Sequence, residues 1–148
     1  MTPHPITFLL AEDDDGHASL VQRNLERAGL VNGFLRVRDG QELLDCLATQ
    51  GTSQGLALHE AIVVLLDINM PRIDGIETLR QIKSNPDMRR IPVIMLTTTD
   101  DPREIDRCYE LGCNVYITKP VEYGGFIDAI RRLGLFLQIV QRPRTGRA

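Results

Sequence analysis

Short apolar runs rich in valine, isoleucine and leucine alternate along the chain with segments in which apolar residues recur every three or four positions. Runs of the first kind are typical of buried strands, and spacing of the second kind is typical of helices that cover a sheet. Five such pairs follow one another, with the runs at about residues 6–11, 34–37, 62–66, 93–97 and 115–118. The alternation predicts an α/β fold, a doubly wound parallel sheet with helices on both faces.

Three of the predicted helices begin at an aspartate that is followed three residues later by a glutamate. This is the pattern of a capping box, in which side chains satisfy free N–H groups of the first turn. The pairs are Asp39–Glu42, Asp74–Glu77 and Asp101–Glu104. The helix after Asp101 is predicted to end at Gly112, a residue suited to a left-handed cap. Its sheet-facing residues are predicted to be Ile105, Cys108 and Tyr109.

The last helical pattern is longer than one sheet face requires, because it begins at about Phe126 and continues to about Gln141. Three apolar residues are left over, namely Leu135, Phe136 and Ile139. A contiguous exposed apolar patch usually marks an interface, so these residues predict a surface for a homodimer or another partner. The alternative is that the extension folds back on its own monomer.

Length and composition suit one domain, because 148 residues with 43% apolar side chains can bury a single core and leave no room for a substantial second one. We expect that domain to span 1–148, with a core at about 6–132 and an extended C-terminal helix and tail at about 133–148. No apolar run reaches the roughly 18 residues of a membrane span, and no basic leader precedes one. We therefore expect a cytoplasmic protein.

Charge and cysteine content argue against several classes of protein, namely those that bind nucleic acid or membranes and those built on disulfides or zinc. The net charge is −3 with both signs mixed throughout, so no overall field favours nucleic acid or an anionic membrane. The arginines near the C-terminus come with no recognition helix and are expected to form a solvated end: Arg131, Arg132, Arg142, Arg144 and Arg147. The cysteines lack C-x-x-C spacing and are predicted to be buried reduced thiols: Cys46, Cys108 and Cys113.

Polar residues follow four of the five apolar runs. The first run leads into an acidic pair, and the third, fourth and fifth end in an acid, a hydroxyl and an amine: Glu12 and Asp13, then Asp67, Thr97 and Lys119. The carboxyl ends of parallel strands share one edge of the sheet, where open α/β proteins place their chemistry. Any one of these residues has a structural explanation, such as a helix cap or a solvated turn. Their conjunction at successive strand ends predicts a functional site.

Three carboxylates within a few ångströms repel one another by several kcal/mol unless a cation lies among them. With oxygen ligands and no nearby histidine or cysteine, Mg²⁺ is favoured, and Mn²⁺ or Ca²⁺ can substitute for it. The expected ligands are Glu12, Asp13 and Asp67, and the backbone carbonyl of Asn69 is placed to join them.

Such a metal would neutralise an incoming phosphoryl group, so that Asp67 could attack phosphorus as a nucleophile. Lys119 would then pair with one phosphoryl oxygen, and the hydroxyl of Thr97 would bind another. Pro120 adds a conformational element, because X-Pro bonds tolerate the cis form and a cis turn would direct the Lys119 ammonium back over the sheet edge.

With these residues assembled, the sequence closely resembles the receiver domain of two-component response regulators over about 6–132. The matching segments are Leu-Leu-Ala-Glu-Asp-Asp, Leu-Leu-Asp-Ile-Asn-Met-Pro-Arg-Ile-Asp-Gly, Ile-Met-Leu-Thr-Thr and Val-Tyr-Ile-Thr-Lys-Pro. We accordingly predict five strands in the flavodoxin-like order 2-1-3-4-5. The resemblance implies that a sensor histidine kinase transfers a phosphoryl group to Asp67. It also implies a signalling protein that turns over no separate substrate, and so not an enzyme.

The resemblance further implies a conformational switch. On phosphorylation Thr97 would move toward the phosphoryl group, and Tyr116 would swing into the space behind it. The extra methyl of Thr98, at a position where the family often has alanine or serine, would limit access for donors.

A narrower resemblance is to the stand-alone regulators paired with phytochrome-type histidine kinases. It rests on the long loop before the third strand, the segments Ile-Lys-Ser-Asn-Pro and Leu-Thr-Thr-Thr, and the apolar ending. It implies a bacteriophytochrome as kinase, no output domain, and a homodimer formed through the fourth helix, fifth strand and fifth helix.

Three alternatives compete with this interpretation. A haloacid-dehalogenase-type phosphohydrolase also uses an aspartate nucleophile, but it needs a second aspartate as general acid where this chain has Asn69. A nucleotide or flavin binder needs a phosphate loop after the first strand, where this chain is acidic. The third alternative is a receiver that is never phosphorylated and serves only as a protein-interaction module. All the site residues are present, so the sequence does not favour it.

Overall fold

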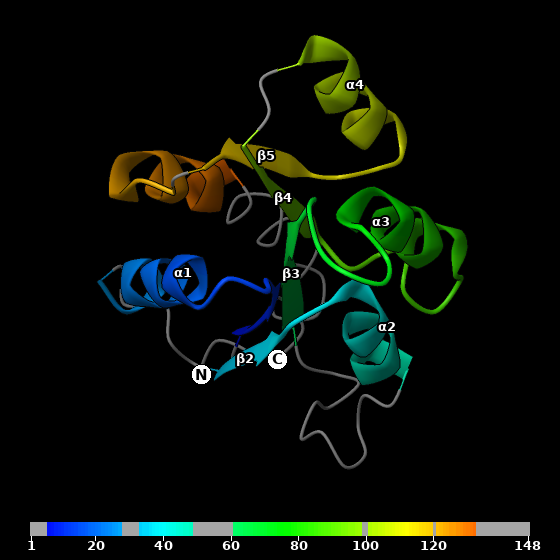
Figure 1. Cartoon of the computed structure of the whole chain (residues 1–148), viewed down its shortest axis with the longest axis horizontal. Coiled ribbons are helices and arrows are strands. Elements are labelled where there is room, and N and C mark those ends of the chain that lie inside the picture. The colour runs from blue at the N-terminus through cyan, green and yellow to red at the C-terminus, as the bar shows by residue number, and fades with distance from the viewer. Residues whose placement is uncertain (1–5, 28–32, 49–60, 99–100, 120, 133–148) are drawn as a thin grey trace, which may run out of the picture.

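The computed structural model describes residues 6–27, 33–48, 61–98, 101–119 and 121–132. In these ranges a central sheet carries helices on both faces, as Figure 1 shows. The strands are β1 (Ile6–Ala11), β2 (Gly33–Val37), β3 (Ala61–Asp67), β4 (Val93–Thr97) and β5 (Val115–Thr118). The helices are α1 (Asp15–Arg27), α2 (Gly40–Ala48), α3 (Gly75–Ser84) and α4 (Pro102–Glu110), and a further helix spans 123–132.

All five strands are parallel and lie in the order β2-β1-β3-β4-β5. The predicted α/β class, strand number and order are therefore confirmed. The register aligns the carboxyl ends of the strands, as three pairs of neighbouring residues show: Ala11 with Leu66, Asp67 with Leu96, and Thr97 with Thr118. The polar residues at the strand ends consequently reach one edge of the sheet together.

Side chains alternate between the two faces along each strand, and the sheet therefore separates two hydrophobic clusters. On one face, α1 and helix 123–132 cover a cluster that includes Phe8 and Phe126. On the other, α2, α3 and α4 cover a cluster that includes Leu79 and Cys108. These faces are called here the α1 face and the α3 face, and the two groups of helices lie on opposite sides of the sheet in Figure 1.

The predicted helix starts are confirmed, and one of the caps uses a different partner. Each predicted aspartate accepts a hydrogen bond from a backbone N–H of the first turn: Asp39 from Glu42, Asp74 from Glu77, and Asp101 from Arg103. At α4 the prediction of Glu104 as partner was wrong. The Glu104 N–H donates to the backbone carbonyl of Asp101 at 3.1 Å, so the short Asp101 side chain caps the preceding N–H instead.

The prediction that Tyr109 faces the sheet was also wrong, because 45% of this residue is exposed. Cys108 is fully buried, and it is the one residue of α4 that is. A helix turns by about 100° per residue, and the apolar stripe of α4 is too narrow to bury two neighbours. The predicted end of α4 is confirmed, since Gly112 has φ +105°, a conformation that favours glycine.

All three cysteines are buried and free, as predicted. Burial raises the pKa of the Cys113 thiol to about 12 and also raises the pKa of Cys108 and of Cys46. These thiols are therefore protonated and packed in the core.

Several predicted residues lie outside the described ranges. They are Pro120 and the leftover apolar residues Leu135, Phe136 and Ile139. Among the helices that are described, none is long and apolar enough to cross a membrane.

Candidate functional site

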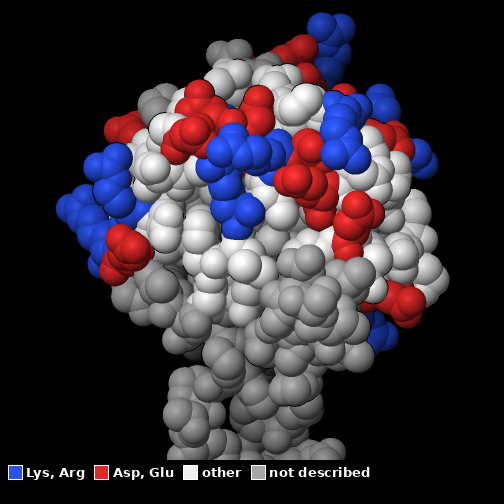
Figure 2. Space-filling model, turned by 60° about the horizontal axis from the view of Figure 1, so that its bottom comes forward, with Lys and Arg blue, Asp and Glu red and all other residues white. Residues whose placement is uncertain are grey.

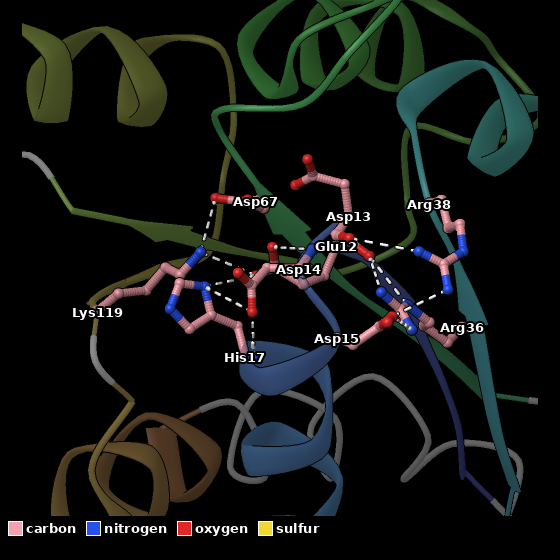
Figure 3. Close-up of polar contacts among 9 residues, drawn as sticks. All are labelled: Glu12, Asp13, Asp14, Asp15, His17, Arg36, Arg38, Asp67 and Lys119. Carbon is pink, nitrogen blue, oxygen red and sulfur yellow. Dashed lines mark hydrogen bonds and ion pairs between the residues drawn. The ribbon is translucent and has the colours of Figure 1, made fainter.

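The charged residues at the strand ends meet at the carboxyl edge of the sheet (Figure 3). Lys119 Nζ lies 2.9 Å from Glu12 Oε1 and 3.3 Å from Asp67 Oδ1. Their side chains are 5%, 1% and 4% exposed, respectively. Each lies two positions beyond a residue of the α1-face cluster, so strand alternation directs all three to that face. The fold thus holds two carboxylates and one ammonium group together away from water.

Asp13 adds a third carboxylate at the surface of this group. One oxygen from each of Glu12, Asp13 and Asp67 lies within 4.8 Å of the others. Asp13 is exposed, and in the view of Figure 3 Asp67 lies between it and Lys119. Carboxylate oxygens on a partly open site are the donors that a hard divalent cation takes while it retains waters. The residues present therefore fit a cation such as Mg²⁺ or Mn²⁺.

The charge balance of the cluster also favours a bound cation. Burial raises the pKa of Asp67 to about 7, and the hydrogen bond and charge of Glu12 add to the rise, while Lys119 opposes it. One ammonium therefore does not balance the carboxylates that surround it. A divalent cation would supply the missing positive charge and favour the ionised form of Asp67.

The loop after Asp67 is held close to the end of β3. The Gly75 N–H donates to the Ile68 carbonyl at 2.7 Å, and a Cβ at Gly75 would lie 2.2 Å from the Asp67 carbonyl oxygen. Only glycine allows α3 to begin this near to Asp67. Within the loop, Asn69 is exposed, and Arg72 has φ +68° and pairs with Asp39 at 3.3 Å. The loop that carries the predicted Asn69 ligand is thus tied to the start of α2.

The predicted switch residues lie on the opposite side of the sheet from the charged trio. Thr97 is fully buried at the end of β4, and its carbonyl accepts the Lys119 N–H at 2.6 Å. Tyr116 is half-buried and packs against the α3-face cluster. Thr97 lies two positions beyond Met95 of that cluster, and Tyr116 pairs with Met95 across the two strands, so both share the α3 face. Thr98 is exposed, one residue beyond Thr97.

Sequence reasoning missed a histidine beside the site. The expectation that no histidine lies nearby was wrong, because His17 Nδ1 is 3.9 Å from Glu12 Oε1 and 3.9 Å from Asp14 Oδ1. The first turn of α1 places it there, and its spacing of five residues from Glu12 across a strand-to-helix turn was the available signal.

Two other contacts also went unpredicted. Arg36 of β2 donates to the Glu12 carbonyl. The buried Asn24 side chain donates to the Val121 carbonyl at 3.1 Å, which ties the segment after Lys119 to α1. Both contacts join residues far apart in the sequence, which is why local patterns do not reveal them.

The surface of the described residues carries both signs of charge (Figure 2). Figure 2 shows acidic and basic side chains lying next to one another on the face that it presents. This agrees with the mixed charge of the sequence.

Comparison with known proteins identifies the family. The pattern of the family described as "Response regulator receiver domain" matches residues 8–131. A response regulator receiver domain from Rhodospirillum rubrum is 47% identical, with a TM-score of 0.71, over 90% of this chain and 94% of that one.

Two further similar proteins are a bacteriophytochrome response regulator and a regulator with a metal-bound structure. The bacteriophytochrome response regulator RtBRR is 40% identical, with a TM-score of 0.76, over 86% of this chain and 77% of that one. Response regulator Rcp1 from Synechocystis sp. is 37% identical over 115 residues, which are 78% of this chain and 77% of Rcp1. A solved structure described as the Mn²⁺-bound form of Rcp1 is 33% identical, with a TM-score of 0.67, over 81% of this chain and 84% of that one.

Proposed function

The chain belongs to the response regulator receiver domain family, and on that premise we propose that Asp67 accepts a phosphoryl group from a sensor histidine kinase. The observation that carries the proposal is the placement of Asp67 at the end of β3, buried beside Glu12 and paired with Lys119 at the edge of the sheet. An aspartate in such a position is held by its pairing with Lys119 and is kept from bulk water. Both conditions favour a nucleophile that must attack in line.

In the proposed reaction a carboxylate oxygen of Asp67 forms a bond to the phosphorus of a phosphohistidine. The P–N bond breaks, its electron pair returns to the imidazole nitrogen, and the products are an acyl phosphate and the unphosphorylated kinase histidine. Lys119 already lies 3.3 Å from Asp67 Oδ1, so its ammonium can pair with a phosphoryl oxygen after a small movement. The chain would undergo this modification itself, and we do not propose turnover of a separate substrate.

We propose Glu12, Asp13, Asp67 and the carbonyl of Asn69 as the residues that would hold Mg²⁺, with Mn²⁺ or Ca²⁺ as substitutes. The three carboxylates that lie within 4.8 Å support this assignment, as does the description of the related Rcp1 as Mn²⁺-bound. When bound, the cation would neutralise charge on the phosphoryl oxygens. Glu12 and Asp13 would then hold it through carboxylate oxygens that lie beside Asp67.

We propose that the signal passes from one face of the sheet to the other. Thr97 is buried at the end of β4 and Tyr116 is half-buried on the neighbouring strand, so movement of Thr97 toward the phosphoryl group would leave space for Tyr116. Thr98 is exposed beside them and would limit the size of the donor.

The proposed kinase is a bacteriophytochrome, because RtBRR is named a bacteriophytochrome response regulator and is 40% identical to this chain. We also propose a homodimer through Leu135, Phe136 and Ile139, supported by the apolar excess of the sequence. Phe136→Glu should lower the mass measured by light scattering, and an unchanged mass would reject this dimer surface.

Intact-mass measurement after incubation with acetyl phosphate tests the central proposal. We expect a gain of one phosphoryl group that requires Mg²⁺ and is absent in Asp67→Asn. If no mass is gained, the experiment is repeated with a phosphorylated histidine kinase. A gain only from the kinase would mean that small donors are excluded, and no gain from either would leave an unphosphorylated interaction module.

The metal assignment has its own test. Asp13→Asn should raise the Mg²⁺ dissociation constant by about tenfold or more, because it removes one charged ligand. Asp87, an exposed acid elsewhere on the surface, provides the matched control Asp87→Asn. Equal titration curves for the two variants would remove Asp13 from the site.

A further inference from the structure

Arg36 makes an unusual contact for a charged residue on an edge strand. Its Nε and Nη2 atoms donate to the backbone carbonyl of Glu12, at 2.9 Å and 2.8 Å. Its Nη1 atom donates to Asp15 Oδ1 at 2.8 Å. The guanidinium therefore spans the turn between β1 and α1, as Figure 3 shows.

Strand alternation explains how Arg36 reaches this turn. Phe34, two residues earlier on β2, packs against the α1-face cluster, so Arg36 emerges on that same face. Its Cα lies beside Leu10 of β1, two residues before Glu12. Only 21% of the side chain is exposed, which indicates that the guanidinium is enclosed by the turn it contacts.

The contact holds the part of the backbone from which two proposed metal ligands project. The Glu12 N–H donates to the Val37 carbonyl at 3.0 Å, and the Glu12 carbonyl accepts the two bonds from Arg36. Both backbone groups of Glu12 are thus bound to β2. The carbonyl belongs to the peptide that links Glu12 to Asp13, so its orientation determines where the Asp13 side chain begins.

We propose that Arg36 is a positioning residue for the cation site, holding the turn so that the carboxylates of Glu12 and Asp13 converge on Asp67. The proposal rests on the proposed function, since it assumes that these carboxylates bind Mg²⁺. Partners that orient metal ligands commonly change metal affinity by about 10- to 100-fold when they are removed.

Electrostatics alone makes the opposite prediction. Arg36 carries a positive charge close to a proposed cation site, so its removal should strengthen Mg²⁺ binding if charge were its main effect. Positioning predicts weaker binding after the same substitution. The sign of the change in the dissociation constant therefore separates the two effects.

Arg38 provides the matched control. It lies two residues further along on the same side, and its Nη2 donates to the same Asp15 Oδ1 at 2.9 Å. Its contact with the turn is a single long bond of 3.4 Å to the Asp13 carbonyl, and its side chain is 57% exposed. The two arginines therefore match in charge and in one partner, and differ in their hold on the backbone.

The experiment compares wild type, Arg36→Gln, Arg36→Lys and Arg38→Gln. Mg²⁺ affinity is measured by calorimetric titration, thermal unfolding is measured in chelator, and phosphorylation by acetyl phosphate is followed across Mg²⁺ concentrations. We expect Arg36→Gln to raise the dissociation constant about tenfold and Arg38→Gln to leave it unchanged or lower it slightly. Saturating Mg²⁺ should restore the phosphorylation rate of Arg36→Gln, as expected for a defect in affinity.

Arg36→Lys keeps the charge but cannot present two parallel N–H groups, and its affinity should fall between those of wild type and Arg36→Gln. It also keeps the test decisive if Arg36→Gln does not fold. The proposal is overturned if the folded Arg36 variants bind Mg²⁺ as tightly as Arg38→Gln, whatever their unfolding temperature. Failure of wild type itself to bind Mg²⁺ would refute the metal site of the proposed function and this inference with it. The wild-type titration therefore tests the proposed function, and the comparison of the variants with wild type tests the role of Arg36.

Discussion

Two clusters of three charged side chains lie on either side of the turn between β1 and α1, and they differ most in burial. The first is a buried trio in which every side chain is at most 5% exposed: Glu12, Asp67 and Lys119. The second is called the exposed trio because two of its side chains are exposed, while that of Arg36 is enclosed by the turn; the exposed fractions are 74%, 21% and 57%, respectively: Asp15, Arg36 and Arg38. Similar distances between opposite charges therefore occur in very different surroundings.

The difference shows that the energetic contribution of an ion pair depends on its burial and charge balance as much as on the distance between its charges. In the buried trio the charges have lost water, and two acids face one base, so the cluster carries an unbalanced negative charge once Asp67 is ionised. In the exposed trio one acid faces two bases, and water screens the attraction. The first cluster is suited to binding a cation, and the second to holding a backbone turn in place.

Removal of the single base from the buried trio should have the largest effect. Lys119→Met leaves two buried carboxylates without a counter-charge, and it should lower the free energy of unfolding by about 3 kcal/mol in chelator. Urea unfolding measures the change, with Arg38→Met as the control that removes an exposed cation. Equal midpoints for the two variants would show that burial does not set the value of the pair.

Removal of one acid from the same trio should change the free energy of unfolding in the opposite direction. Asp67→Asn should raise the free energy of unfolding at pH 8 in chelator by on the order of 2 kcal/mol, because the folded state raises the pKa of Asp67 to about 7.

The pH dependence follows from that shift. The folded protein binds more protons than the unfolded chain between about pH 4 and pH 7, so stability should fall as pH rises through that range. Asp67→Asn should flatten the profile. Parallel profiles for wild type and variant would assign the slope to other groups.

Magnesium should relieve the same unbalanced charge. Above its dissociation constant, each tenfold increase in Mg²⁺ should add about 1.4 kcal/mol to the free energy of unfolding of wild type. Asp67→Asn, which lacks one proposed ligand, should respond less. Unfolding midpoints that stay constant from chelator to millimolar Mg²⁺ would argue against a cation site in the folded protein.

The smallest effect is expected in the exposed trio. Hydrogen bonds from Arg36 and the charge of Arg38 lower the pKa of Asp15, but its side chain is 74% exposed, so water screens the pairs. Asp15→Asn should leave the unfolding midpoint unchanged within error. A clear loss of stability, abolished by salt, would show that the exposed trio contributes more than its exposure suggests.

Much of the fold could be predicted from the sequence because its signals are local. The apolar runs are short and the helix starts are marked by aspartates, so the five strands and the starts after Asp39, Asp74 and Asp101 appear where expected. Tyr109 was misplaced because its burial depends on how closely α4 approaches the sheet. A periodic pattern of residues contains no information on that distance.

The candidate site divides in the same way. Its acids and its amine could be found because each ends a strand, and parallel strands bring their carboxyl ends to one edge. Asn24 and Arg36 could not be found, since each contacts a residue that is distant in the chain. His17 lies only five residues from Glu12, and that spacing was its one local signal. Their roles depend on side-chain direction after folding.

The sequence by itself determined the α/β class, the strand and helix positions, and the set of residues at the strand ends, because hydrophobic period and capping act within a few residues. The tertiary structure alone decided the environment of those residues. It placed Glu12, Asp67 and Lys119 on the α1 face, Thr97 and Tyr116 on the α3 face, and the Arg36 guanidinium on the Glu12 carbonyl. The physical reason is that burial, charge balance and hydrogen-bond direction arise only when distant segments pack together.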